Sequence, residues 1–143
     1  MKNNETQYVI FRLDTEYYGI NIDYVQTIER IMNITRVPKT DEYIKGVINL
    51  RGEIVPVIDL RSRFNLPVTD YTNETRIIVN RIDDILIGFI VDSASEVKDI
   101  QKEDIDYNIV DDNFNEGFVK GIAKIDDRVI ILVDEYKILN MNM

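Results

Sequence analysis

Short apolar runs separated by turn residues recur along this chain of 143 residues. In YIKGVINLRGEIVPVIDLRSRF, residues 43–64, two runs rich in β-branched side chains flank the pair Arg51–Gly52. Such runs predict the two strands of a β-hairpin, and Gly52 suits the positive φ of a tight hairpin turn. The turn itself does not require an arginine. Arg51 is therefore either a solvated turn residue or an anchor that binds a carboxylate of a partner.

The hairpin pattern occurs a second time. FVKGIAKIDDRVIILVDEYKIL, residues 118–139, aligns with residues 43–64 and places Asp126–Asp127 where the first copy has Arg51–Gly52. Upstream, YYGINID at 17–23 is similar to LIGFIVD at 86–92. We interpret the similarity as an internal duplication of approximately 7–66 and 75–139; the alternative is chance similarity between β-rich segments.

Each copy is predicted to contain about five short antiparallel strands and a short terminal helix. The first strands are expected at Gln7–Leu13 and Arg76–Ile82. Five strands suffice for a small barrel, which removes exposed sheet edges, so the chain is expected to be all-β with two such barrels.

The segment DYVQTIERIM, residues 23–32, is predicted to be helical. Val25, Ile28 and Met32 recur at helical spacing, and Asp23 can cap the first turn. Val25 and Ile28 would then share one helical face, which either belongs to the core or lines a binding groove.

Composition excludes several classes of function. The formal net charge is -9, and the 17 basic residues are scattered among 26 acidic ones, which argues against a nucleic-acid surface. Polar residues interrupt every apolar run, so neither membrane insertion nor a secretory signal is expected. The absence of cysteine is consistent with a cytoplasmic protein.

Candidate chemistry is sparse. Without histidine or cysteine, the chain lacks the usual proton shuttle, the thiolate nucleophile and the preferred ligands of zinc. The carboxylate pairs Asp83–Asp84, Asp111–Asp112 and Asp126–Asp127 lie between predicted strands, where Asp commonly forms turns. No calcium loop or phosphate-binding loop is present. We expect no catalytic activity, no metal site and no cofactor.

The run IKGVINLRGEIVPVIDL, with YVIFRL, YYGINIDYVQTIER and GFIVDSASEV, strongly resembles the CheW family of bacterial chemotaxis coupling proteins. The resemblance extends from about Gln7 to Leu139. It implies a single CheW-like domain over residues 1–143, built from two five-stranded barrels described as Src-homology-3-like or oligonucleotide-binding-like. Members of the family exchange strands between the barrels.

The resemblance also implies a function. CheW proteins are non-catalytic adaptors that link the cytoplasmic tip of methyl-accepting chemotaxis receptors to the regulatory domain of the histidine kinase CheA. The expected location is the cytoplasm, with recruitment to receptor arrays at the membrane. The family's receptor-binding groove lies between the barrels, and its positions correspond here to Ile22, Val25, Ile28, Arg51 and Val97. The kinase-binding residues cannot be assigned from the sequence.

Other interpretations of the same pattern remain. The regulatory domain of CheA and the amino-terminal domain of CheV are close relatives, but they usually belong to longer chains with a kinase core or a receiver domain. From a different class, a barrel that binds oligosaccharide or single-stranded nucleic acid would expose aromatic residues on a basic face. The 8 Tyr and 5 Phe are not interleaved with basic residues, which disfavours this class.

Overall fold

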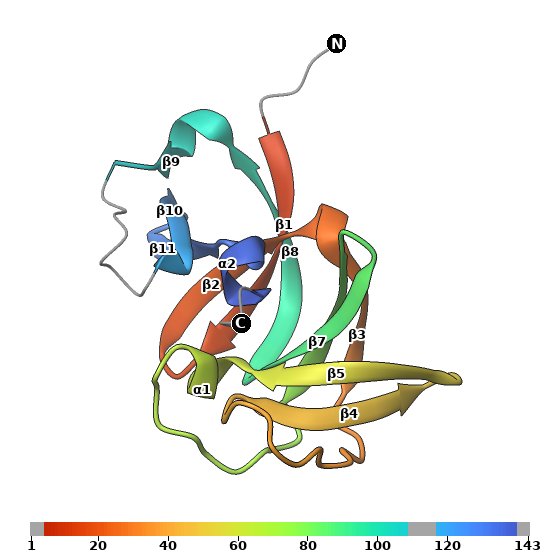
Figure 1. Ribbon diagram of the computed structural model, residues 1–143. Helices are drawn as coiled ribbons and strands as arrows, with labels where there is room; N and C mark the ends of the chain where they lie inside the picture. The colour runs from red at the N-terminus through yellow and green to blue at the C-terminus, as the bar shows by residue number, and fades with distance from the viewer. Residues whose placement is uncertain (1–4, 109–116, 140–143) are drawn as a thin grey trace. The chain divides into compact units, whose positions relative to one another are not determined.

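The computed structural model describes residues 5–108 and 117–139. They form two curled β-sheets with a few short helices (Figure 1), so the predicted all-β class is confirmed. The chain divides into two compact units. Unit 1 combines Met1–Tyr24 with Ser95–Met143, and unit 2 is Val25–Ala94. Each unit therefore contains strands from both halves of the sequence.

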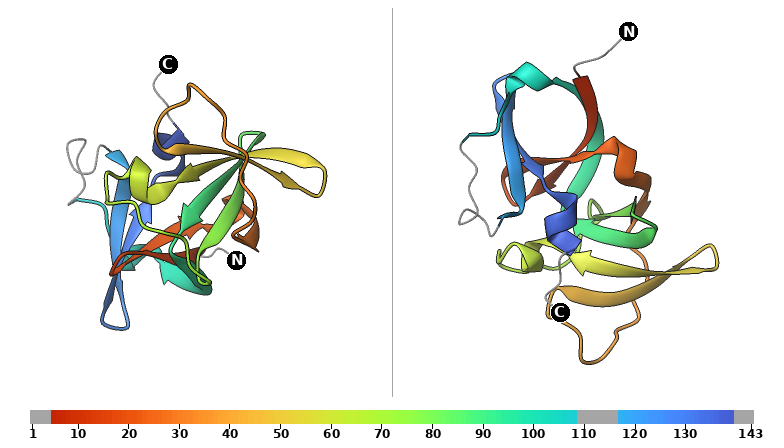
Figure 2. Two further views of the ribbon diagram at one scale, coloured as in Figure 1. Left: turned by 90° about the horizontal axis from the view of Figure 1, so that it is seen from below. Right: turned by 45° about the horizontal axis from the view of Figure 1, so that its top comes forward.

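Unit 1 is built on a six-stranded sheet in the order β8-β1-β2-β11-β10-β9. In the right-hand view of Figure 2 these strands curl strongly. The curl encloses a core of Tyr8, Ile10, Ile100, Ala123, Ile130 and Leu132. The sheet has six strands rather than the predicted five because the two-residue β9 adds to the edge of β10. Its strands are β1 (Glu5–Leu13), β2 (Glu16–Asn21), β8 (Ser93–Gln101), β9 (Ile105–Asp106), β10 (Val119–Ile125) and β11 (Arg128–Val133).

Unit 2 is built on a five-stranded sheet in the order β3-β6-β7-β5-β4. Alternate side chains of its strands point to one face and form a core of Ile48, Val55, Val57, Ile77, Val79 and Ile90. The strands are β3 (Val25–Arg30), β4 (Ile44–Leu50), β5 (Glu53–Asp59), β6 (Arg76–Ile82) and β7 (Ile85–Val91).

The edges of the unit 2 sheet approach each other although no continuous ladder joins them in the described residues. Thr35, which follows β3 at one edge, forms an isolated antiparallel bridge with Val47 of β4 at the other edge. The two N–H···O bonds of this bridge measure 2.8 and 2.9 Å. The sheet is therefore curled to near closure.

Irregularities recur at corresponding positions of the two predicted copies. The β4–β5 ladder shifts register between Ile44 and Gly46, and the β10–β11 ladder shifts between Val119 and Gly121. The parallel contacts also correspond, since β5 pairs with β7 in unit 2 and β11 pairs with β2 in unit 1. These matches support the duplication, which stays a prediction.

A short helix ends each hairpin, as predicted. α1 (Leu60–Arg63) begins after Asp59, whose carboxylate accepts the backbone N–H groups of Arg61 and Ser62. α2 (Glu135–Leu139) follows Asp134, which accepts the N–H groups of Tyr136 and Lys137 at 3.1 Å. An Asp at this position satisfies helix N–H groups that would otherwise lack a partner.

The prediction of a helix at residues 23–32 is wrong. The segment forms a single 3₁₀ turn, η1 (Ile22–Tyr24), and then strand β3. Asp23 does not cap a helix; its own N–H donates to the side chain of Asn21 at 2.9 Å. In copy two, η2 (Lys102–Asp104) is a similar short turn.

Candidate functional site

Residues Arg51 and Gly52 form the tip of the β4–β5 hairpin. Both have positive φ, 51° at Arg51 and 89° at Gly52, which is the pattern of a two-residue turn matched to the twist of the strands. The N–H of Gly52 donates to the side chain of Asn49 at 3.0 Å and fixes the turn. Arg51 therefore occupies a backbone position that Gly or Asn would adopt more easily, so the turn does not explain the arginine.

The side chain of Arg51 contacts Glu29. Its Nη1 lies 3.3 Å from Oε2 of Glu29, and the same oxygen accepts the hydroxyl of Thr27 at 2.7 Å. The Arg51 side chain is 70% exposed, whereas that of Glu29 is 17% exposed. Most of the guanidinium surface is thus available to a partner, and one carboxylate orients it.

A β-bulge places Val25 and Ile28 on one face of β3. Val25 lies opposite Asn80 and Ile28 lies opposite Ile78, two positions apart on β6, while the register shifts between Val25 and Thr27. A strand with a period of two would put these residues on opposite faces, and the extra residue of the bulge restores a common face. The three-residue spacing that suggested a helix has this origin.

The other two predicted binding residues belong to unit 1. Ile22 is half-buried in η1, and Val97 on β8 is 49% exposed. In unit 2, Val25 is half-buried and Ile28 is 39% exposed. None of the five predicted residues is fully buried, so Val25 and Ile28 are not ordinary core residues. Val25, Ile28 and Arg51 belong to unit 2, whereas Ile22 and Val97 belong to unit 1.

The tip of the β10–β11 hairpin carries a corresponding pair of opposite sign. Asp126 and Asp127 have φ of 52° and 65°, and the carboxylate of Asp126 accepts from Nζ of Lys98 at 2.9 Å. This hydrogen bond lowers the pKa of Asp126. Lys98 follows Asp92 by six residues, as Glu29 follows Asp23, so Lys98 corresponds to Glu29 in the two copies. Asp126 corresponds to Arg51, and the two ion pairs therefore have exchanged charges.

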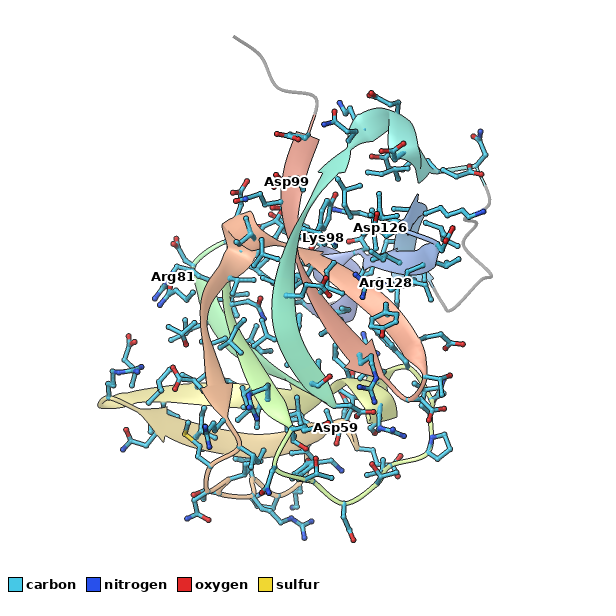
Figure 3. The ribbon with its side chains drawn as sticks, turned by 180° about the vertical axis from the view of Figure 1, so that it is seen from behind. Asp59, Arg81, Lys98, Asp99, Asp126 and Arg128 are labelled. Atoms are coloured by element: carbon cyan, nitrogen blue, oxygen red, sulfur yellow. The ribbon has the colours of Figure 1, made fainter. Side chains whose placement is uncertain are left out.

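A second ion pair reinforces this tip. Arg128 donates two hydrogen bonds to Glu96, at 3.2 and 2.9 Å, and the guanidinium lies 4.6 Å from the ring centre of Tyr17. The hydrogen bonds lower the pKa of Glu96 and raise that of Arg128. Figure 3 shows Lys98 on β8 beside Asp126 and Arg128 of the hairpin. Asp126 is therefore more than a turn residue, contrary to its sequence-based interpretation.

Sequence reasoning missed Glu29, Lys98 and the exposed Ile54. Ile54 follows the β4–β5 tip and is 61% exposed. Aligning the residues after Asp23 with those after Asp92 would have placed Glu29 over Lys98 and revealed the exchanged charges. The exposure of Ile54 has no sequence signal, because it lies within an unbroken apolar run.

The described residues offer little for catalysis. Asp83 and Asp84 form the β6–β7 tip with φ of 49° and 68°, which fits the turn interpretation, whereas Asp111–Asp112 lies outside the described residues. Within residues 5–108 and 117–139, no group of three or more acidic side chains is arranged to hold a metal ion. No helix in the same ranges has the length and apolar character needed to cross a membrane.

Comparison with known proteins identifies the family. The CheW-like domain model matches residues 7–143. The chain is 37% identical to the chemotaxis protein CheW of Bacillus subtilis (strain 168), over 92% of this chain and 85% of that protein. It is 35% identical to CheW of Helicobacter pylori, over 93% of this chain and 81% of that protein.

A solved structure has the same fold. The crystal structure of the scaffolding protein TtCheW from Thermoanaerobacter tengcongensis superposes with a TM-score of 0.89 at 37% identity, covering 96% of this chain and 94% of that one. In contrast, the chemotaxis protein CheV3 of Helicobacter pylori is 29% identical, and the match covers only 41% of its length. On these matches, this chain belongs to the CheW family.

Proposed function

We propose that this chain, a chemotaxis adaptor of the CheW family, couples methyl-accepting receptors to the histidine kinase CheA without catalysing a reaction. The observation that carries the proposal is the similarity to CheW proteins in sequence and in fold over nearly the whole chain. The adaptor acts in the cytoplasm and joins receptor arrays at the membrane. Its partners are the cytoplasmic receptor tip and the regulatory domain of CheA.

The proposed receptor-binding residues are Ile22, Val25, Ile28, Arg51 and Val97. Three features of unit 2 support their role. Ile28 and Arg51 are exposed, Glu29 orients the guanidinium, and Ile54 adds exposed apolar surface next to the tip. A protein interface typically combines apolar contacts with an arginine that makes forked hydrogen bonds, and these side chains supply both.

Reconstitution tests the proposal. Purified CheA and membranes bearing a methyl-accepting receptor, both from the same organism as this chain, are mixed with and without the adaptor, and receptor-bound CheA and its autophosphorylation are measured. We expect both to rise with added adaptor and the kinase activity to fall when attractant is added. If CheA and the receptor each fail to bind the folded adaptor, the proposal is wrong.

A further inference from the structure

A cavity of about 560 Å³ lies in unit 2, away from the β4–β5 tip. The loop between β3 and β4 forms most of its wall, and Ile44 and Lys45 of β4 and Tyr71 from the segment between α1 and β6 contribute the rest. Neither the predicted binding residues nor the ion pairs of the two hairpin tips line it. The cavity is therefore separate from the proposed receptor-binding residues.

Backbone contacts hold the base of the loop that forms the cavity. Its base is the Thr35–Val47 bridge, and it passes so close to Gly46 that a Cβ there would lie 2.0 Å from the carbonyl oxygen of Thr35. Gly46 also has a φ of 145°, which L side chains rarely adopt. Within the loop, Thr40 Oγ1 donates to the carbonyl of Val37 at 3.2 Å. The base of this wall is therefore fixed before a ligand arrives, whereas residues 35–42 are exposed.

Three cationic side chains line the cavity without a partner. Arg36, Lys39 and Lys45 form no ion pair, side-chain hydrogen bond or ring contact with the described residues. Among the other cations of unit 2, Arg51 pairs with Glu29 and Arg61 pairs with Asp92 at 2.6 Å, whereas Arg30 has no partner in the described residues. In a chain with a formal net charge of -9, a gathering of unpaired cations in one cavity is a local exception.

Two acidic residues, Asp41 and Glu42, also line the cavity and offset part of its positive charge. The carboxylate of Asp41 accepts the hydroxyl of Tyr43 at 2.9 Å. Glu42 also lines a second, smaller cavity beside Pro67, which places it at the rim that the two cavities share. Three cations against two carboxylates leave the lining with a net positive charge, which favours an anion at Arg36, Lys39 and Lys45.

The remaining wall is apolar. Ile34, Val37 and Ile44 line it, and the ring of Tyr71 is held in place by its hydroxyl, which donates to Asp59 at 3.2 Å. Burial and the nearby carboxylate of Asp59 raise the pKa of Tyr71, so the hydroxyl stays protonated and keeps donating at neutral pH. A ligand that suits the cavity has an apolar group between negative charges.

We propose that this cavity binds an extended acidic peptide segment of a partner protein, with a leucine-like side chain against Val37 and Tyr71 and its carboxylates at Arg36, Lys39 and Lys45. The site is separate from the proposed receptor-binding residues, and its test does not depend on receptor coupling. Charge complementarity selects the acidic segment, and the apolar wall distinguishes a peptide from a simple anion.

The probe is a synthetic pentapeptide, acetylated and amidated at its ends, with four carboxylates around one central leucine. Its binding to the full chain is measured by calorimetry and by amide chemical shifts. We expect shift changes at Ile34, Val37 and Ile44, and weaker binding as salt is raised. The triple variant Arg36→Gln, Lys39→Gln, Lys45→Gln should bind about tenfold more weakly, since three exposed charge contacts are lost.

A matched control separates the site from net charge. The variant Arg30→Gln, Lys102→Gln, Lys124→Gln also removes one Arg and two Lys, all exposed and without a partner in the described residues. It should bind the peptide like wild type, and both variants are first checked for an unchanged melting temperature.

The proposal is overturned if the peptide does not bind, or if both triple variants bind it equally. Two further outcomes would also overturn it. Equal binding of a peptide with Gln and Asn in place of the acids would show that the cavity does not select charge. Equal binding of inorganic phosphate, or of a peptide with alanine in place of leucine, would show a simple anion site.

Discussion

Arg51 and Glu29 form an ion pair between elements at opposite edges of one sheet, with Nη1 and Oε2 separated by 3.3 Å. Lys98 and Asp126 occupy the corresponding positions of the other unit with the charges exchanged and a distance of 2.9 Å. Each hairpin tip thus contacts an edge strand of its own sheet, β3 in unit 2 and β8 in unit 1. The two tips differ in the sign of the charge that each carries, Arg51 at one and Asp126 at the other.

Arg51 should contribute little to stability. Its pair with Glu29 is mostly exposed on the arginine side, so Arg51→Ala is expected to lower the free energy of unfolding by about 0.2–1 kcal/mol. Arg51→Asn should recover part of this loss, because Asn tolerates the positive φ better than Ala does. Urea unfolding measures both. A loss above about 2 kcal/mol in Arg51→Ala would mean that the arginine has a structural role.

The charges of Lys98 and Asp126 should be energetically coupled, although their exchange is not neutral because Lys98 also lies 3.9 Å from Glu96. Lys98→Glu alone, or Asp126→Lys alone, places like charges together at the tip and should destabilise unit 1. The double variant should recover about 0.3–1 kcal/mol relative to the sum of the single changes. The coupling energy from a double-mutant cycle should shrink at 1 M salt. A coupling energy of zero at low salt would show that the contact is not maintained in solution.

Glycine at the second tip should stabilise the chain. Asp127 has a φ of 65°, and Asp127→Gly removes that strain while leaving the Lys98–Asp126 contact in place, for a gain of about 0.3–1 kcal/mol. Changing Asp126 as well would sacrifice that contact. Asp84→Gly, with a φ of 68° in the β6–β7 turn, is the matched control and should behave alike. Destabilisation at both sites in thermal melts would refute the strain argument.

Two carboxylates should make opposite contributions to the pH dependence of stability. Burial raises the pKa of Glu135 above 4.5 despite Lys120 at 3.8 Å, so its contribution is present below the unfolded pKa and is lost as pH rises through the folded pKa. Hydrogen bonds from Arg128 lower the pKa of Glu96, so its contribution is present above the unfolded pKa and is lost as pH falls through the folded pKa.

Variants resolve these contributions. Relative to wild type, Glu135→Gln should gain stability as pH rises from about 4 upward, whereas Glu96→Gln should lose it over the acid range. Only the change of each difference with pH is read, so a constant offset from lost contacts does not matter. Parallel pH profiles for Glu135→Gln and wild type would show that the folded protein does not perturb this carboxyl.

The hydrophobic pattern predicted the strands of the two hairpins correctly but predicted a helix in place of β3. Alternation and turn residues located both hairpins, because their ladders are regular from the register shift to the tip, over Gly46–Leu50 and Gly121–Ile125. In β3 the bulge near Gln26 inserts a residue, so Val25 and Ile28 share a face at a spacing that is typical of a helix. The spacing of apolar residues alone does not distinguish a helix from a strand with a β-bulge.

The site was predictable only in part. The interpretation of Arg51 rested on a resemblance, and its contact with Glu29 could not be foreseen, since β3 and β4 are the outer strands of the sheet order and meet only through its curl. The exchange of charge at the second tip was readable in principle from the duplicated sequence. The cavity beside Tyr71 depends on the path of an irregular loop, which has no periodicity to read.

Titration of a receptor signalling tip against wild type, Arg51→Ala and Arg51→Lys tests the central claim most directly. Arg12→Ala serves as the control, because Arg12 is a half-buried arginine outside the predicted site whose guanidinium makes an exposed hydrogen bond to a turn carbonyl. Loss of an arginine that binds a partner's carboxylate should weaken receptor affinity by about 1.5–3 kcal/mol, roughly ten- to a hundredfold. Arg51→Lys should restore only part, while Arg12→Ala and the binding of CheA to Arg51→Ala stay near wild type. Unchanged receptor affinity in a folded Arg51→Ala protein would contradict the account and leave Arg51 as a solvated turn residue.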